Sequence, residues 1–124
     1  MMKKLFNMFK NPDINAELDE FDNLPDAMLL DVRTPQEHSE GHIPLSVNIP
    51  AYELHRMEEE VANKDVPVFV YCASGARSRL AVQVLHGMGY KNARNIGGMD
   101  RYLGKIEQSP DNVVFRTLEA WNGV

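Results

Sequence analysis

The stretch VPVFVYCASGARS, residues 66–78, predicts a buried strand, a tight loop and the start of a helix. Its first six residues are apolar and include β-branched and aromatic side chains, as in a strand that is buried. Cys72 comes next, and only small residues separate it from Arg77. Residues 77–88 then carry apolar side chains at helical spacing. This order directs backbone N–H groups and a positive helix end at one point, so we expect the Cys72 thiol to shift toward the thiolate.

Strand and helix patterns alternate along the rest of the chain. The expected strands cover residues 28–32, 46–48, 66–72 and 93–96, and the expected helices cover residues 15–21, 35–40, 51–62, 77–88 and 109–122. Short apolar strands joined by helices predict an α/β fold with a parallel sheet of about four or five short strands and helices on both faces. Ligands of such sheets bind beyond the carboxyl ends of the strands, where Asp31 and Cys72 fall.

Several of these helices carry more specific signals. Asn15 is the expected N-cap of the first one. Thr34 is followed by Pro35 and by Glu37, which closes a capping box, and Gly41 ends that helix. The helix over residues 51–62 is expected to bury Leu54, Met57 and Val61 and to expose Glu58–Glu60. The helix over residues 77–88 is expected to bury one apolar face, made of Leu80, Ala81, Val84, Leu85 and Met88.

The composition is that of an ordinary globular domain. With 124 residues, 44% of them hydrophobic and 25% charged, the chain fits one domain with a single core. The net charge of -5 argues against nucleic acid as a partner. The single cysteine excludes an internal disulfide, a two-cysteine redox cycle and a cysteine-rich zinc site. A free thiol fits a reducing compartment, so we expect a cytoplasmic protein.

The two ends of the chain are expected to lie outside the main domain. Residues 1–13 form a basic tail whose apolar part is too short and interrupted for a signal peptide. This tail is expected to dock loosely or to form a short amphipathic surface helix, and no stretch is long enough to span a membrane. Residues 107–124 are expected to form a helical extension beginning near Ser109. Its apolar face, with Trp121, is expected to pack on its own domain or to make a dimer contact.

Six short motifs follow one another in an order and at a spacing that resemble those of single-domain rhodanese-like sulfurtransferases. The resemblance covers residues 14–106. The motifs are Asp31-Val32-Arg33, Glu37-His38, Gly41-His42-Ile43, Asn48-Ile49-Pro50, the loop from Cys72 to Arg77, and Gly97-Gly98. The chain departs from the family pattern at Leu45-Ser46, where a pair of small residues is usual.

The resemblance implies a parallel α/β rhodanese fold and a Cys72 persulfide intermediate, with no cofactor. Such enzymes take sulfane sulfur from a donor such as thiosulfate and pass it to a thiophilic acceptor such as cyanide or a thiol. Two alternatives stay open: a carrier module that a sulfur-donating protein loads, and a phosphatase or arsenate reductase. The loop favours sulfur over phosphorus chemistry, since four residues separate Cys72 from Arg77, one fewer than in protein tyrosine phosphatases.

The residues around Cys72 suit an anionic sulfur. A persulfide needs several inward-pointing N–H donors, which small residues with flexible backbones can supply, and Gly75 is expected to have a positive φ. Arg77 offers a planar fork for the sulfonate oxygens of a donor. The hydroxyls of Ser74 and Ser78 can bond to the sulfur, or these residues can act through their backbone or as helix caps. The expected substrate-binding set is Ala73, Ser74, Gly75, Ala76, Arg77 and Ser78. The opposing interpretation is that Cys72 is a buried, inert thiol.

Residues near the first strand are expected to support this site. Asp31 either bonds the loop or orients Arg77, or it only anchors the end of its strand. Arg33 is expected to pair with Glu37. His38 and His42 are four residues apart, as in a metal pair, but Gly41 interrupts the helix and no third ligand is near, so we expect no metal site. His42 resembles the family's structural histidine.

Overall fold

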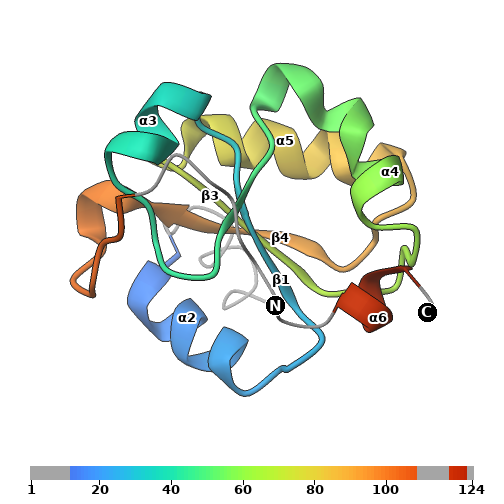
Figure 1. Ribbon diagram of the computed structural model, residues 1–124, viewed down its shortest axis with the longest axis horizontal. Coiled ribbons are helices and arrows are strands. Elements are labelled where there is room, and N and C mark those ends of the chain that lie inside the picture. Colours follow the sequence, from blue (N-terminus) through green and yellow to red (C-terminus); the bar gives the residue numbers. More distant parts are fainter. Residues whose placement is uncertain (1–11, 109–117, 123–124) are drawn as a thin grey trace, which may run out of the picture.

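Four parallel strands form a sheet in the part of the chain that the structure, a computed structural model, describes: residues 12–108 and 118–122 (Figure 1). Their order across the sheet is β2-β1-β3-β4. The strands are β1 (Met28–Asp31), β2 (Val47–Asn48), β3 (Val68–Cys72) and β4 (Ala93–Gly98). The predicted parallel α/β fold is therefore confirmed.

The helices connect these strands and cover both faces of the sheet. They are α2 (Ile14–Asp22), α3 (Pro35–Glu40), the 3₁₀ helix η1 (Ala51–Arg56), α4 (Met57–Glu60), α5 (Ala76–Gly87), the 3₁₀ helix η2 (Met99–Arg101) and α6 (Leu118–Asn122). In Figure 1, α2 lies on one side of the sheet, and α4 and α5 lie on the other. Within the described ranges, no helix combines the length and the apolar character that a membrane span would need.

The core has two parts because successive side chains of a strand point to opposite faces. On one face, Phe69 and Tyr71 of β3 pack in a cluster with Ile14 and Phe21 of α2. On the other face, Val68, Val70 and Cys72 belong to a cluster that also contains residues of α4 and α5. All residues of β1 and β3 are buried, as expected for central strands covered on both faces.

The register brings three strand ends to the same edge of the sheet. Asp31 pairs with Tyr71, and Cys72 pairs with Gly98. The carboxyl ends of β1, β3 and β4 therefore meet where ligands of parallel sheets bind. This edge is where the sequence places Asp31 and Cys72.

Of two predicted helix starts, one is wrong and the other is confirmed. The helix α2 begins at Ile14, and the carboxylate of Asp13 accepts from the Asn15 N–H, so the prediction that Asn15 is the cap is wrong. The Asn15 side chain instead bonds to the backbone of Arg101 and Leu103, which joins α2 to the segment after β4. In α3 the predicted capping box between Thr34 and Glu37 is present, with both side chains bonded to the opposite backbone N–H.

The stretch 51–62 buries Leu54, Met57 and Val61 and exposes Glu58–Glu60, as predicted, but it is not one continuous α-helix. Its first part is the 3₁₀ helix η1, with non-helical angles at Glu53. Only the short α4 follows.

The buried face of α5 differs from the predicted one. Leu80 and Val84 are 61% and 50% exposed, whereas Ala81, Val82 and Leu85 are buried. The reason lies at the start of the helix, where Ser78 is fully buried beside Cys72. Residues three, four and seven positions after Ser78 share its side of the helix and therefore face the sheet.

The described end of the C-terminal segment packs on the domain itself. Trp121 is buried in the larger core cluster, and its Nε1–H donates to the carbonyl of Asp26. This contact agrees with the first of the two expectations for the extension. Ser109 and the residues up to 117 lie outside the described residues, so the predicted helix start there is not described.

Candidate active site

Cys72 is the last residue of β3, and its sulfur lies beneath the loop that leads into α5. The backbone N–H of Gly75 donates to Sγ at 3.0 Å, and that of Ser78 donates to Sγ at 3.4 Å. The Ser78 Oγ lies 3.3 Å from Sγ. Cys72 is fully buried, but these polar contacts distinguish it from a thiol that only fills space in the core.

The shape of the loop requires two glycines, one in the loop and one in the strand beneath it. Gly75 has a φ of +98°, the left-handed region that L residues rarely adopt, as predicted. Gly98 of β4 lies directly under the loop, where a Cβ would come within 2.6 Å of the Cα of Ser74. The N–H of Asp100 donates to the carbonyl of Ala73 and ties the loop to the start of η2.

The hydrogen bonds around Sγ favour its anionic form. Burial raises the pKa of the Cys72 thiol, but hydrogen bonds from the Ser78 hydroxyl and from the N–H groups of Ser78, Gly75 and Ser74 lower it, and the net pKa is below the ordinary value. Ser78 thus acts through both its side chain and its backbone, and Ser74 through its backbone. Ala73, Ser74, Gly75 and Ala76 are partly or fully exposed and form the rim of the loop.

Arg77 is paired with Glu37, and the predicted pair between Arg33 and Glu37 is wrong. The Arg77 Nη1 and Nη2 lie 2.7 Å and 2.9 Å from the two carboxylate oxygens of Glu37. The hydrogen bond from Arg77 is the main reason why the pKa of Glu37 falls to about 2. Glu37 is therefore part of the site, although its sequence signal, the capping box, indicates only a local role at the start of α3.

Asp31 anchors the end of β1. Its carboxylate accepts from the Arg33 Nε and Nη2 at 3.0 Å and 2.8 Å, contacts the His38 Nδ1 at 2.8 Å and accepts from the Tyr71 hydroxyl at 3.2 Å. Burial raises the pKa of Asp31, but the bonds from His38 and Arg33 lower it by more. These contacts agree with the anchoring alternative. Arg33 pairs with Asp31 because the two side chains leave the same strand end.

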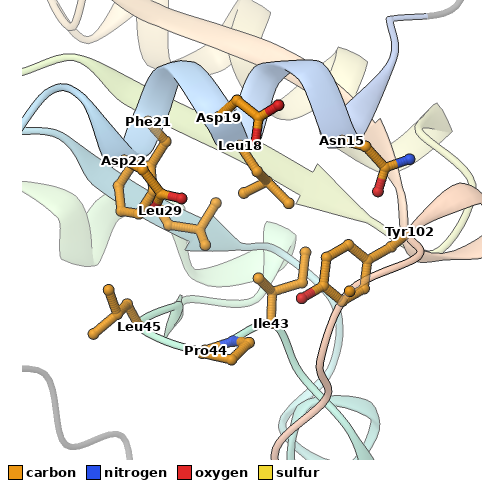
Figure 2. A pocket seen from close by; sticks show the side chains of 11 residues that line it. Asn15, Leu18, Asp19, Phe21, Asp22, Leu29, Ile43, Pro44, Leu45 and Tyr102 are labelled. Atoms are coloured by element: carbon orange, nitrogen blue, oxygen red, sulfur yellow. The ribbon is translucent and has the colours of Figure 1, made fainter.

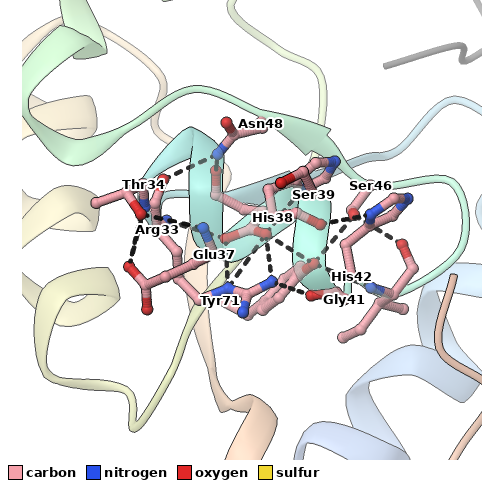
Figure 3. Close-up of polar contacts among 12 residues, drawn as sticks. Arg33, Thr34, Glu37, His38, Ser39, Gly41, His42, Ser46, Asn48 and Tyr71 are labelled. Carbon is pink, nitrogen blue, oxygen red and sulfur yellow. Dashed lines mark hydrogen bonds and ion pairs between the residues drawn. The ribbon is translucent and has the colours of Figure 1, made fainter. Parts of the chain in front are cut away.

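The two histidines stack on each other instead of converging on one point. Their rings are 3.9 Å apart and nearly parallel, and the His42 Nδ1 bonds to the His38 carbonyl (Figure 3). The His38 Nδ1 faces Asp31. Among the described residues, no three His, Cys, Asp or Glu side chains gather as a metal site would require.

A separate cavity of about 370 Å³ lies on the α2 face of the sheet (Figure 2). It is bounded by α2, by the segment Ile43–Leu45 and by Tyr102, and its walls are mainly apolar. Among the described residues that line it, none belongs to the Cys72 loop. Leu45 has a φ of +72°, in the left-handed region that a residue with a branched side chain rarely adopts. Cys72 therefore lies at the carboxyl end of the sheet and not in this cavity.

Known proteins share this architecture. Residues 15–105 match the family described as Rhodanese-like domain. Protein YqhL of Bacillus subtilis (strain 168), described as uncharacterized, is 39% identical over 82 residues, which cover 65% of this chain and 64% of that protein. Thiosulfate sulfurtransferase PspE of Escherichia coli (strain K12) is 37% identical over 71 residues, which cover 56% of this chain and 68% of that protein. A solved structure of a rhodanese with anions from E. coli superposes with a TM-score of 0.63 at 31% identity, over 67% of this chain and 99% of that chain.

The family match spans most of the chain and includes both the sheet and the Cys72 loop. The solved rhodanese, above 30% identical, supports the same assignment through its fold. The chain belongs to the rhodanese-like domain family.

Proposed function

We propose that the protein is a sulfurtransferase that moves sulfane sulfur from a donor such as thiosulfate to cyanide or a thiol through a persulfide on Cys72. The observation that carries this proposal is the set of hydrogen bonds to Sγ from Gly75 and Ser78. Donors that stabilise a thiolate also suit the terminal sulfur of a persulfide, since both are anions of sulfur.

The reaction takes two steps and balances without an external oxidant or reductant. In the first step the Cys72 thiolate attacks the outer sulfur of thiosulfate. The donor's S–S bond breaks, and sulfite leaves with the electron pair. In the second step cyanide or a thiolate attacks the terminal sulfur of the persulfide, which releases thiocyanate or a new persulfide and returns Cys72 as a thiolate.

Arg77 is suited to hold the donor at the mouth of the loop. Each terminal nitrogen of a guanidinium carries two hydrogens, and the pair with Glu37 uses one on each. The remaining hydrogens can bond the sulfonate oxygens of thiosulfate. Arg77 is 40% exposed, so a small anion can reach it from solvent.

A carrier loaded by a partner protein is the second candidate. Two observations favour it: Glu37 already occupies one edge of the Arg77 fork, and Cys72 is fully covered. Both reduce the access of a free anionic donor, whereas a protein that docks on the loop can open it. In this case a sulfur-donating protein is the partner, and thiosulfate is a poor substitute.

A donor panel with a matched variant tests both candidates. The protein and its Cys72→Ser variant are each incubated with thiosulfate and with a cysteine desulfurase plus cysteine. The gain of one sulfur atom is measured by mass, and thiocyanate release is measured after cyanide is added. The enzyme proposal expects rapid loading by thiosulfate and turnover, both lost in the variant. Rapid loading by the desulfurase alone supports the carrier. No loading by either donor contradicts both.

A further inference from the structure

Asn95 of β4 lies beneath the loop and bonds to it through both ends of its side-chain amide. Its Oδ1 accepts from the Ser78 hydroxyl at 2.7 Å and from the Gly97 N–H at 3.0 Å. Its Nδ2 donates to the Gly75 carbonyl at 3.4 Å. A backbone N–H can only donate and a backbone carbonyl can only accept, so these partners fix the orientation of the amide.

The Ser78 hydroxyl has more acceptors than hydrogens. Besides Asn95 Oδ1, the Gly75 carbonyl lies 3.1 Å from Ser78 Oγ, and Cys72 Sγ lies 3.3 Å away. A hydroxyl carries one hydrogen, so it can serve one of these acceptors at a time. Asn95 Oδ1 is the nearest of the three. Ser78 is fully buried, so water does not share in this choice.

The protonation state of Cys72 decides which acceptor takes the hydrogen. With a neutral thiol, the S–H can donate to Ser78 Oγ while the hydroxyl donates to Asn95. With a thiolate, Sγ is a stronger acceptor, and the hydroxyl turns toward it. Asn95 Oδ1 then keeps only the Gly97 N–H. Formation of the anion therefore costs the bond between Ser78 and Asn95.

We propose that Asn95 is a positioning residue for the sulfur chemistry, because its Oδ1 competes with Sγ for the single Ser78 hydrogen. This inference rests on the proposed function insofar as the Cys72 anion is the reacting species. When the Cys72 thiol is neutral, the bond to Asn95 holds the Ser78 hydroxyl in one orientation. The hydroxyl stays close enough to Sγ to donate to it once the thiolate forms. A stronger acceptor at position 95 should therefore disfavour the anion, and the effect should require Ser78.

A double-mutant cycle on the full chain tests this dependence. Cys72 is the only cysteine, so the ultraviolet thiolate absorbance reports its titration at pH values below those at which tyrosines ionise. Asn95→Asp should raise the pKa of Cys72 by at least about one unit through the stronger acceptor and the added charge. In a Ser78→Ala background the same substitution should raise it by less than half as much. The charge effect and the lost Nδ2–H are common to both backgrounds and cancel in the comparison. Charged groups on the surrounding elements, Arg77, Glu37 and Asp31, are unchanged.

A measurement on the unmodified chain guards against variants that fold poorly. When Cys72 is titrated, the amide proton of Gly97 should shift with the same midpoint as the thiolate absorbance, because its bond to Asn95 Oδ1 strengthens. The side-chain amide of Asn92, which bonds to Asp65 O at the other end of β4, serves as the control and should stay constant.

The inference would be overturned if Asn95→Asp shifted the Cys72 pKa equally in the two backgrounds. It would also be overturned if the chemical shift of the Gly97 amide proton did not change as the thiolate forms. Neither measurement uses a sulfur donor. A chain that shows the coupling but forms no persulfide contradicts the proposed function and leaves the role of Asn95 intact. A chain that transfers sulfur but lacks the coupling contradicts the role of Asn95 and leaves the proposed function intact.

Discussion

Gly98→Ala should disable the sulfur site while the sheet stays folded, because the loop passes directly over this glycine. A Cβ at position 98 would lie 2.6 Å from the Cα of Ser74 and 2.7 Å from the carbonyl carbon of Ala73. Both are backbone atoms, so no side-chain rotation can relieve the overlap. Gly98 also pairs with Cys72 on the neighbouring strand, which places the disturbance next to the proposed nucleophile.

The size of the effect follows from this geometry. An ordinary contact begins near 3.4 Å, so the loop must rise by about 0.8 Å, the difference between 3.4 Å and 2.6 Å. Overpacking of this kind costs about 1–3 kcal/mol of stability. The Ser78 N–H already lies 3.4 Å from Sγ, so a shift of this size removes at least that bond from the sulfur. Loss of one hydrogen bond to a charged group costs about 1.5–3 kcal/mol, which is roughly one to two units in the pKa of the thiol.

Gly75→Ala is the matched control in the same loop. Its Cβ would lie 3.5 Å from the Cα of Gly97, which is an ordinary contact. Its cost comes instead from the φ of +98° and amounts to about 1–2 kcal/mol. The two variants should therefore lose similar stability, a melting temperature lower by several degrees. The thiol pKa should rise by more in Gly98→Ala than in Gly75→Ala, because only the first variant forces the backbone of the loop away from β4.

Thermal unfolding by circular dichroism measures the stability of both variants. Thiolate absorbance against pH, together with the thiosulfate–cyanide assay, measures the site. If Gly98→Ala keeps the wild-type thiol pKa and turnover, the loop does not lie on this glycine as described, and the reasoning is refuted. A thiol pKa that rises equally in both variants would also refute it, because general loss of stability would then be the cause.

Three further expectations concern Cys72 and the ion pair between Arg77 and Glu37. Cys72→Ser should abolish sulfur transfer and leave the melting temperature within a few degrees of the wild type, because a hydroxyl is a far weaker nucleophile of nearly the same shape; residual transfer would contradict the mechanism. Arg77→Ala should lower the efficiency of thiosulfate loading roughly ten- to a hundredfold, the cost of one charge-assisted contact, and change the lifetime of the loaded persulfide far less; unchanged loading kinetics would remove Arg77 from donor binding. The Glu37 pKa of about 2 lies below its ordinary 4.5, so the pair with Arg77 adds stability that is present above pH 4.5 and is lost as the pH falls toward 2. Denaturant unfolding at a series of pH values should show that loss in the wild type and a smaller one in Glu37→Gln, and identical profiles would contradict the assignment.

The features that the sequence predicted well depend on contacts close in the chain. The Cys72 loop is one example, since a strand, a turn with Gly75 and a helix start determine its shape within a few residues. The capping box of Thr34 and Glu37 is another, and it spans a single helical turn. Parallel pairing of the strands followed from their continuous apolar character, because only a sheet covered on both faces buries such strands completely.

The wrong predictions concern which side chains pair and which helix face is buried. Both depend on residues that are distant in the sequence and meet only in the fold. Glu37 and Arg77 are 40 positions apart, and their pairing depends on where α3 lies above the loop. Arg33 pairs instead with Asp31, two positions earlier at the end of β1. The rotation of α5 was mispredicted because Leu80 and Val84 are apolar, whereas the polar Ser78 determines the buried face through its contact with Sγ. Asn95 carried no local signal at all.

The contacts of α3 connect the carboxylate at the end of β1 to the arginine of the loop. Asp31 holds the His38 ring of α3, and Glu37, the preceding residue of the same helix, holds Arg77. No hydrogen bond among the described residues joins Asp31 to the loop directly. Because a short helix moves as one body, a change at Asp31 reaches Arg77 through the position of α3. Besides anchoring its strand, Asp31 is therefore expected to help place Glu37. Its effect on thiosulfate loading should become smaller once Glu37 is replaced, leaving only the direct attraction between the charges of Asp31 and Arg77.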